Sequence, residues 1–170
     1  MACFWRAMTA ADLPQVMQIA ARVHIGYFES EAVFAERLAL FAPGCMVAVA
    51  QGAESTLLGY GIMHPARYGH PPALDSLLHR LDIDADGLHL HDIALLPQAR
   101  GGGLGRALME RMHDLMRQHH LAHASLVAVH GSAAYWRDAG FVPDASMQVR
   151  LASYGKNALY MVLSIRDNNK

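Results

Sequence analysis

A run of glycines before an apolar helix pattern is the strongest chemical signal in the chain. Four of the five residues at 101–105 are glycine, and Arg100 and Arg106 flank them. Without a Cβ atom, glycine lets a ligand approach the backbone and lets the chain turn its amides inward. The first amides of a helix lack internal partners and lie at the positive end of its dipole. We therefore expect an anion site, with a phosphate as its natural ligand and the two arginines adding charged contacts.

Three kinds of phosphate loop could use such glycines. The ATP type needs lysine and then serine or threonine after its last glycine, but Arg106 and Ala107 follow Gly105. The dinucleotide type needs a small residue where Leu108 stands and an acid about twenty residues further on, and no such acid is present. The third type, Arg-x-x-Gly-x-Gly, matches residues 100–105.

Two histidines precede the glycines on a segment that alternates like a strand. Side chains alternate along a strand, so we expect His89 and His91 to share a face with Ile93 and Leu95, and Asp92 to face away. A primary amine reacts as a nucleophile only in its neutral form, but an alkylammonium has a pKa near 10.4. An imidazole titrates near 6.5 and could remove the proton from the ammonium. The alternative is that both histidines only satisfy polar positions at a sheet edge. A zinc site lacks a third ligand at a recognisable spacing, so no metal is predicted.

Composition limits the class of protein. At 170 residues, with 53% hydrophobic and 17% charged residues, the chain is expected to form a single folded domain over 1–170. A net charge of -1 and the lack of a basic run argue against nucleic acid, and no apolar run is long enough for a membrane span. Cys3 and Cys45 show neither metal spacing nor a disulfide framework, which favours a reducing cytoplasm.

Hydrophobic periodicity and capping residues predict the elements that position these residues. Thr9 with Asp12 predicts a helix start, and Ser30 and Ser132 are expected to cap further helices. The predicted strands are 2–8, 45–50, 57–64, 88–96, 124–130, 145–152 and 157–165. The predicted helices are 13–23, 30–41, 104–116 and 132–138, and a long excursion over 65–87 holds a short helical piece at 74–81. This order predicts a mixed sheet with helices on its faces.

The Arg-x-x-Gly-x-Gly motif, the element order and "YWRDAGF" at 135–141 together make the chain resemble the GNAT superfamily of acetyl-CoA-dependent N-acetyltransferases. The resemblance covers nearly the whole chain. It implies an α/β (α+β) fold with a mixed, mostly antiparallel sheet that splays between its fourth and fifth strands, with helices on both faces. It also implies that acetyl-CoA is the acyl donor.

The resemblance further implies where the coenzyme binds. Amides of residues 101–106 would hold the pyrophosphate, and the pantetheine arm would enter between strands 88–96 and 124–130. Main-chain groups of Ile93 and Leu95 would pair with that arm, and the Leu95 amide would polarise the acetyl carbonyl. The implied coenzyme contacts are Ile93, Ala94, Leu95, Arg100, Gly101, Gly102, Gly103, Leu104, Gly105, Arg106 and Ser132.

A narrower similarity bears on the mechanism. The segment "HLHDIAL" at 89–95 is similar to a strand of the arylalkylamine (serotonin) N-acetyltransferases, in which two histidines act as bases through water, so His89 and His91 would take that role. Where the family often has a tyrosine that returns a proton to the thiolate, this chain has Trp136. The neighbouring Tyr135 is the candidate acid, and aromatic packing is the alternative for both residues.

The expected function is direct transfer of an acetyl group to the primary amine of a small molecule, such as an aryl- or alkylamine. A neutral or aromatic acceptor fits the few acids of the excursion better than a strongly cationic one. The acceptor is expected beneath the excursion, beside Tyr27, Phe28, His64 and Tyr68. Acetylation of a protein amino group and a non-catalytic acyl-CoA-binding module remain as alternatives, and a homodimer is left open.

Overall fold

The computed structural model describes residues 2–165. The helices are α1 (Leu13–Val23), α2 (Glu31–Leu40), α3 (Leu104–Gln118) and α4 (Ala133–Asp138). The strands are β1 (Cys3–Ala7), β2 (Cys45–Ala50), β3 (Ala53–Ala66), β4 (Gly87–Leu95), β5 (His123–Ala128), β6 (Val142–Pro143) and β7 (Leu159–Ser164). Short 3-10 helices are η1 (Ala10–Asp12), η2 (Ala42–Gly44), η3 (Pro97–Ala99) and η4 (Ala145–Tyr154).

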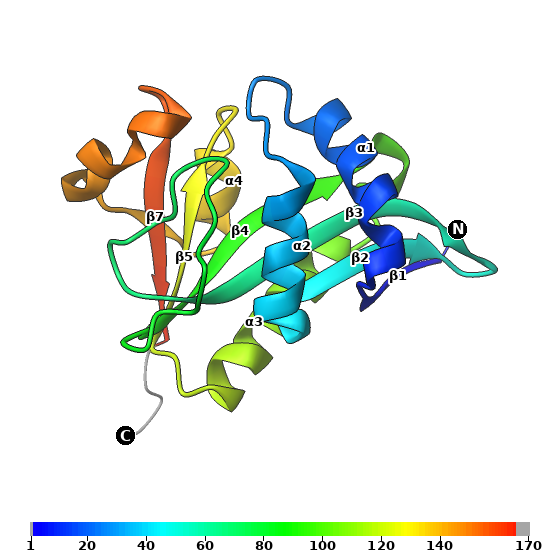
Figure 1. Ribbon diagram of the computed structural model, residues 1–170, viewed down its shortest axis with the longest axis horizontal. Helices are drawn as coiled ribbons and strands as arrows, with labels where there is room; N and C mark the ends of the chain where they lie inside the picture. The colour runs from blue at the N-terminus through cyan, green and yellow to red at the C-terminus, as the bar shows by residue number, and fades with distance from the viewer. Residues whose placement is uncertain (1, 166–170) are drawn as a thin grey trace.

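The seven strands form one sheet in the order β1-β2-β3-β4-β5-β7-β6. All neighbouring strands are antiparallel except β4 and β5, which are parallel. Helices α1 and α2 cross the face of the sheet that is turned to the viewer, and α3 and α4 lie behind it (Figure 1). The predicted mixed, mostly antiparallel sheet with helices on both faces is confirmed. Among the described residues, no helix has the length and hydrophobicity to cross a membrane.

The sheet opens between its two parallel strands. Pairing between β4 and β5 runs from Gly87 with His123 to Leu90 with Leu126 and then stops. Both strands continue, β4 to Leu95 and β5 to Ala128, so their carboxyl ends lie apart. This separation is the predicted splay between the fourth and fifth strands, and it leaves the carboxyl end of β4 without a neighbouring strand on that side.

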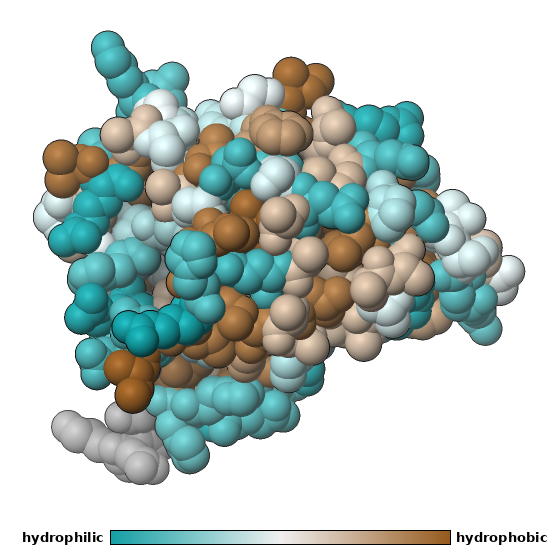
Figure 2. All heavy atoms as spheres, in the orientation of Figure 1, coloured by the Kyte–Doolittle hydropathy of each residue, from teal (hydrophilic) through white to brown (hydrophobic). Residues whose placement is uncertain are grey.

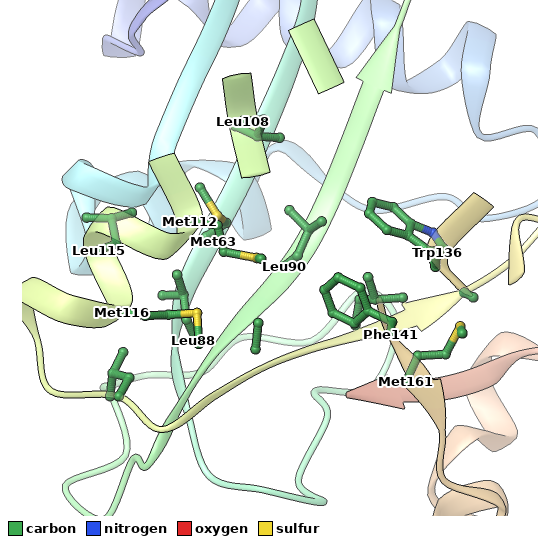
Figure 3. Close-up of a cluster of buried hydrophobic side chains, with 14 of the residues drawn as sticks. Met63, Leu88, Leu90, Leu108, Met112, Leu115, Met116, Trp136, Phe141 and Met161 are labelled. Atoms are coloured by element: carbon green, nitrogen blue, oxygen red, sulfur yellow. The ribbon is translucent and has the colours of Figure 1, made fainter. Parts of the chain in front are cut away.

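An apolar stripe on α3 explains the packing behind the sheet. Leu108, Met112, Leu115 and Met116 recur at helical spacing and are all buried. They pack on Leu88 and Leu90 of β4, and the cluster continues to Trp136, Phe141 and Met161 (Figure 3). This packing holds the first turn of α3 against the sheet, next to the glycine run.

The strand that carries the histidines contains a β-bulge. Ile62 pairs with Asp92 and Met63 pairs with Leu90, so His91 is an extra residue on β4. A bulge breaks the alternation of side chains. Asp92 therefore lies on the same face of the sheet as His89 and His91, and the expectation that it faces away is wrong.

Two predicted elements are absent because other polar groups satisfy their backbone. Residues 145–152 belong to η4 and not to a strand, since the chain leaves the sheet after Pro143, and the Asp144 side chain accepts from the Ser146 amide. Residues 74–81 form no helix. Their amides donate to distant carboxylates instead, with Asp75 bound to Glu29, and Leu78 and His79 bound to Glu36.

Three capping predictions have mixed outcomes. Thr9 and Asp12 form the predicted capping box at η1. Ser30 and Ser132 stand at the N-cap positions of α2 and α4, but neither side chain makes a capping hydrogen bond. Strand β3 begins at Ala53, four residues before the predicted strand at 57–64.

Gly44 has no space for a side chain, which gives a stability prediction. A Cβ there would lie 2.0 Å from the main-chain oxygen of Met63. We expect Gly44→Ala to lower the free energy of unfolding by about 2 kcal/mol or more, because the clash is with backbone. Urea unfolding measures this change. Gly102→Ala is the control, since a Cβ at that position meets nothing within 4 Å, and equal stability of the two variants would contradict the prediction.

Candidate active site

The glycine run leads into α3 in the conformation that an anion site needs. Gly101 and Gly103 have φ values of 77° and 85°, in the left-handed region that favours glycine. A Cβ at Gly101, Gly102 or Gly103 would meet nothing within 4 Å, so this side of the loop is open to a ligand. The Trp5 indole donates to the carbonyl of Leu104 at 2.8 Å and fixes the first turn of α3. The predicted phosphate loop is thus accessible to a ligand, and the helix turn that follows it is held in place by Trp5.

The two arginines of the loop differ in position. Arg100 donates from Nε to the carbonyl of Leu95 at 3.0 Å and lines the cavity between β4 and β5. Arg106 is exposed and its Nε lies 3.2 Å from Glu110 Oε1. Arg100 therefore links the phosphate loop to the open end of β4.

Main-chain groups at the end of β4 point into the opening. The Leu96 amide donates to Leu58 of β3 at 2.8 Å. Successive amides along a strand point to opposite edges, so the amides of Ile93 and Leu95 point away from β3 and towards β5. The carbonyls of the same two residues are bonded by His24 and Arg100. The pairing of Ile93 and Leu95 with the pantetheine arm stays a prediction, and their amides are the groups that could make it.

A cavity of about 420 Å³ occupies the opening between β4 and β5. It contains five of the predicted site residues, namely Tyr27, His91, Ile93, Arg100 and Ser132. It also contains residues that the sequence analysis did not place there, among them His24, Glu29, Asp92, Trp136, Leu74 and Tyr154. The cavity is therefore built from the segment between α1 and α2, the bulge of β4, the end of β5 and α4.

The side chains of both predicted bases are enclosed. His89 is 1% exposed, and its Nδ1 lies 2.9 Å from Ser125 Oγ on β5. The His91 side chain is 0% exposed, so only its main chain reaches the cavity, and its Nε2 lies 2.8 Å from Glu29 Oε1. Their rings are 6.4 Å apart. The structure brings the two histidines together, but the geometry does not favour either imidazole as a group in contact with substrate.

Burial controls the charge of the imidazoles beside the bulge. It lowers the pKa of His89 well below its usual value and that of His64 to about 3, and the neighbouring histidines add to both shifts. The His64 ring is 5.5 Å from that of His89 and 6.0 Å from that of His91. The rings of His64 and His89 are therefore neutral, buried parts of the sheet.

A second imidazole pair lies at the cavity wall. His24 Nε2 is 2.7 Å from Asp92 Oδ1 and 3.1 Å from the Ile93 carbonyl. Asp92 also accepts from the Tyr60 hydroxyl at 2.5 Å. Burial opposes the charge on Asp92, but hydrogen bonds from His24 and Tyr60 hold the pKa of its carboxyl below the usual range. The bulge at His91 creates this arrangement, because it turns Asp92 towards α1.

Several predicted acceptor contacts lie elsewhere. Phe28 is 71% exposed and lines a neighbouring cavity, and His64 is buried in the sheet. Tyr68 donates a hydrogen bond to Asp144, which follows β6, and its ring packs against those of His123 and Tyr160. Of the four predicted contacts, only Tyr27 lines the cavity between β4 and β5.

Tyr135 lies at the phosphate loop and outside this cavity. It is 54% exposed, and its hydroxyl oxygen would be 2.6 Å from a Cβ at Gly105. Trp136 is buried and lines the cavity instead, since adjacent residues of a helix point in different directions. This position favours a contact with the phosphates over acid catalysis for Tyr135.

A smaller apolar cavity of about 250 Å³ adjoins the first. The two cavities share four residues, which are His24, Tyr27, Glu29 and Asp92. The remaining walls come from α1, α2 and the segment between them, namely Met17, Ala20, Ala21, Ile25, Gly26, Phe28 and Phe34. Hydrophobic side chains project at the top of the space-filling view, in the region of that segment (Figure 2).

The sequence does not mark His24 and Glu29 as site residues, because neither belongs to a motif or a hydrophobic periodicity. His24 follows the last residue of α1, and Glu29 lies in the segment before α2. Both resemble ordinary surface residues in the sequence. The one available signal is their position between two predicted helices that must end near the open edge of the sheet.

Comparison with known proteins supports the same reading of the fold. The acetyltransferase (GNAT) family model matches residues 13–141. Among curated proteins, none matches this sequence.

Solved structures match at low identity. A chain of the NatC complex bound to Gag peptide and CoA has a TM-score of 0.74 and 17% identity, covering 98% of this chain and 100% of that chain. The ribosomal-protein-S18-alanine N-acetyltransferase from Escherichia coli has a TM-score of 0.62 and 20% identity, with 99% of each chain covered. PaiA N-acetyltransferase from Thermoplasma acidophilum, in complex with coenzyme A, has a TM-score of 0.68 and 13% identity, covering 97% and 100%. With the splayed sheet, the glycine loop and the family match over most of its length, this chain belongs to the acetyltransferase (GNAT) family, whose members use acetyl-CoA as acyl donor.

Proposed function

We propose that this protein transfers an acetyl group from acetyl-CoA directly to the primary amine of a small molecule. The observation that carries the proposal is a single cavity lined by Arg100, which follows the end of β4 at the glycine loop, and by Glu29 and Asp92. A coenzyme on the loop and an amine at the carboxylates would then meet within one cavity. Such an arrangement suits a sequential reaction without a covalent enzyme intermediate.

The coenzyme contacts follow from the loop and the strand end. Amides of residues 101–106 would bind the pyrophosphate, with Arg100 and Ser132 beside it. Ile93, Ala94 and Leu95 would line the pantetheine arm, and the Leu95 amide would donate to the acetyl oxygen as charge develops there. Trp136, whose ring lies 5.6 Å from that of Phe141, lines the same cavity.

The acceptor would bind as an ammonium ion. Glu29 and Asp92 both line the cavity and add carboxylates to the few acids of the excursion. This placement revises the expectation of a neutral acceptor, because a carboxylate attracts the cationic form of a primary amine. The smaller cavity, lined mainly by apolar side chains, would hold the alkyl or aromatic body of the same molecule.

The excursion at 67–86 supports a small acceptor over a protein chain. Its residues bond to both sides of the cavity, since Leu78 and His79 donate to Glu36 of α2, and the Tyr154 hydroxyl donates to the carbonyl of Pro72 at 2.9 Å. Leu74 of the excursion and Tyr154 of η4 line the cavity. A segment tied on both sides leaves little room for an extended peptide.

Thiol release from acetyl-CoA across a panel of amines tests the proposal. The panel holds arylalkylamines, alkylamines, polyamines and peptides with free amino termini. We expect the highest kcat/KM with aryl- or alkylamines. Turnover with peptides alone would favour the protein-acetylating alternative, and tight CoA binding without turnover of any amine would favour the non-catalytic module.

A substitution in the smaller cavity tests whether the body of the acceptor binds there. Ala20→Phe fills this cavity, so we expect a ten- to hundredfold lower kcat/KM for the preferred amine and an unchanged Kd for CoA. Gln18→Phe is the control, because Gln18 is exposed on the same helix and lines neither cavity. If Ala20→Phe left the kcat/KM of every amine unchanged, the small-cavity subsite would be rejected.

A further inference from the structure

We propose that His24 is the general base that takes the proton from the acceptor ammonium, and that Asp92 and Tyr60 are the residues that position it. The inference rests on the proposed function and assigns a residue to that same site. His24 lies directly after α1 and belongs to both cavities, so it stands at the border between the thioester and the body of the acceptor.

The hydrogen bonds of His24 determine which ring nitrogen is basic. Both partners of Nε2 are oxygen acceptors, the Asp92 carboxylate at 2.7 Å and the Ile93 carbonyl at 3.1 Å. Nε2 must therefore carry the hydrogen, which leaves the lone pair on Nδ1. Within residues 2–165, Nδ1 makes no hydrogen bond and is not among the enclosed polar atoms. An open lone pair beside the cavity is what a general base requires.

Asp92 and Tyr60 hold the imidazole in place. The Tyr60 hydroxyl donates to Asp92 Oδ2 at 2.5 Å, and the other carboxylate oxygen faces His24. Tyr60 is buried, and its ring packs edge-on against Phe34 at 5.7 Å. The buried Tyr60 hydroxyl therefore holds the Asp92 carboxylate in place. This carboxylate would stabilise the imidazolium that forms when His24 Nδ1 accepts a proton.

The side chain of His24 is more exposed than that of His91, the histidine at the bulge. Its side chain is 16% exposed, whereas that of His91 is 0% exposed. The Nδ1 atom of His91 is buried and has no partner within the described residues. Of these two carboxylate-imidazole pairs, only the pair of His24 and Asp92 presents a free ring nitrogen to a ligand.

Acetyl transfer follows deprotonation of the acceptor. The ammonium gives one proton to His24 Nδ1, and the lone pair of the neutral amine forms a bond to the thioester carbonyl carbon. The carbon-sulfur bond breaks, and its electron pair leaves on the CoA sulfur. The second proton lost by the attacking nitrogen passes to that thiolate, and His24 returns the first proton to solvent. The products are the acetamide, CoA and one proton.

Charged groups from three directions act on His24. Asp92 lies on β4, Glu29 precedes α2, and His130 of the segment after β5 stacks on the ring at 5.8 Å. Burial disfavours the imidazolium, but the hydrogen bond and charge of Asp92, with a further contribution from Glu29, raise the pKa of His24 above its usual value. Activity should therefore fall as pH decreases through a value above 6.5.

The pH dependence of kcat/KM for the preferred amine tests the assignment. In His24→Gln we expect about a hundredfold lower kcat/KM at pH 7 and loss of the acidic limb, with an unchanged Kd for CoA. The defect should shrink with a fluorinated primary amine that is already neutral at pH 7, because that acceptor needs no base. Asp92→Asn should retain the limb but move it to lower pH, since the imidazolium loses its counter-charge.

Two further variants test whether the effect is specific to His24. His120→Asn, at the exposed end of α3, should match the parent protein. His91→Gln should keep the acidic limb. If His91→Gln lost the limb while His24→Gln kept it, or if His24→Gln were equally slow with the neutral fluorinated amine, the assignment would be overturned. Absence of turnover in the parent protein with every amine would instead reject the proposed function itself.

Discussion

Gly103→Val is expected to raise the Kd for CoA by a hundredfold or more. Gly103 is the N-cap of α3 with φ at 85°, which a β-branched residue does not adopt without strain. The chain would have to turn the amides of Leu104 and Gly105 away from the phosphates. Each hydrogen bond to a charged group contributes about 1.5 to 3 kcal/mol, so the loss of two is enough for this change in affinity. Isothermal titration calorimetry with CoA measures it.

Gly52→Val is the matched control for backbone strain. Gly52 has φ at 81° in the turn between β2 and β3, and a Cβ there also meets nothing within 4 Å. Both variants should lose similar stability, but only Gly103→Val should lose affinity for CoA. Unchanged affinity in a folded Gly103→Val protein would reject the loop as the pyrophosphate site.

Acidification from pH 7.5 to pH 4.5 is expected to lower the free energy of unfolding by about 4 to 5 kcal/mol. His64 and His89 are buried, and burial holds the pKa of His64 at about 3 and that of His89 well below its usual value. In the unfolded chain both imidazoles bind protons below about pH 6.5. The unfolded state then binds more protons than the folded state, so stability decreases by about 1.4 kcal/mol per pH unit for each histidine.

Urea unfolding between pH 4.5 and pH 7.5 measures this dependence. The pKa of His123 is also lowered by burial and contributes in the same direction. The carboxyls of Asp12 and Asp92 have lowered pKa values, so their contribution is lost only at more acidic pH. His64→Gln should reduce the slope by about one proton, whereas the exposed control His120→Asn should leave it unchanged. A slope that His64→Gln does not change would show that His64 is protonated in the folded protein.

Local pattern in the sequence was sufficient for the phosphate loop and most of the elements. Glycines at 101–105 act through their own backbone, and the apolar stripe of α3 reports which face is buried, so both can be read without knowledge of distant contacts. The mixed sheet followed from the order of these elements, whereas the opening between its fourth and fifth strands followed from the resemblance to the GNAT superfamily. Hydrophobic periodicity and capping residues give a wrong prediction where backbone amides donate to carboxylates far away in the sequence, as those of Leu78 and His79 do to Glu36.

The tertiary structure alone decided which side chains line the cavity between β4 and β5. One extra residue at His91 reverses the face of Asp92, and a bulge leaves no mark in the alternation of the sequence. His24 and Glu29 reach the cavity only because two helices end beside the open edge of the sheet. Burial then decides charge, since desolvation keeps His89 neutral while a carboxylate partner favours the charged form of His24. These effects depend on neighbours far away in the chain. The sequence therefore determined the glycine loop for which we propose coenzyme binding, but not His24, for which we propose the role of base.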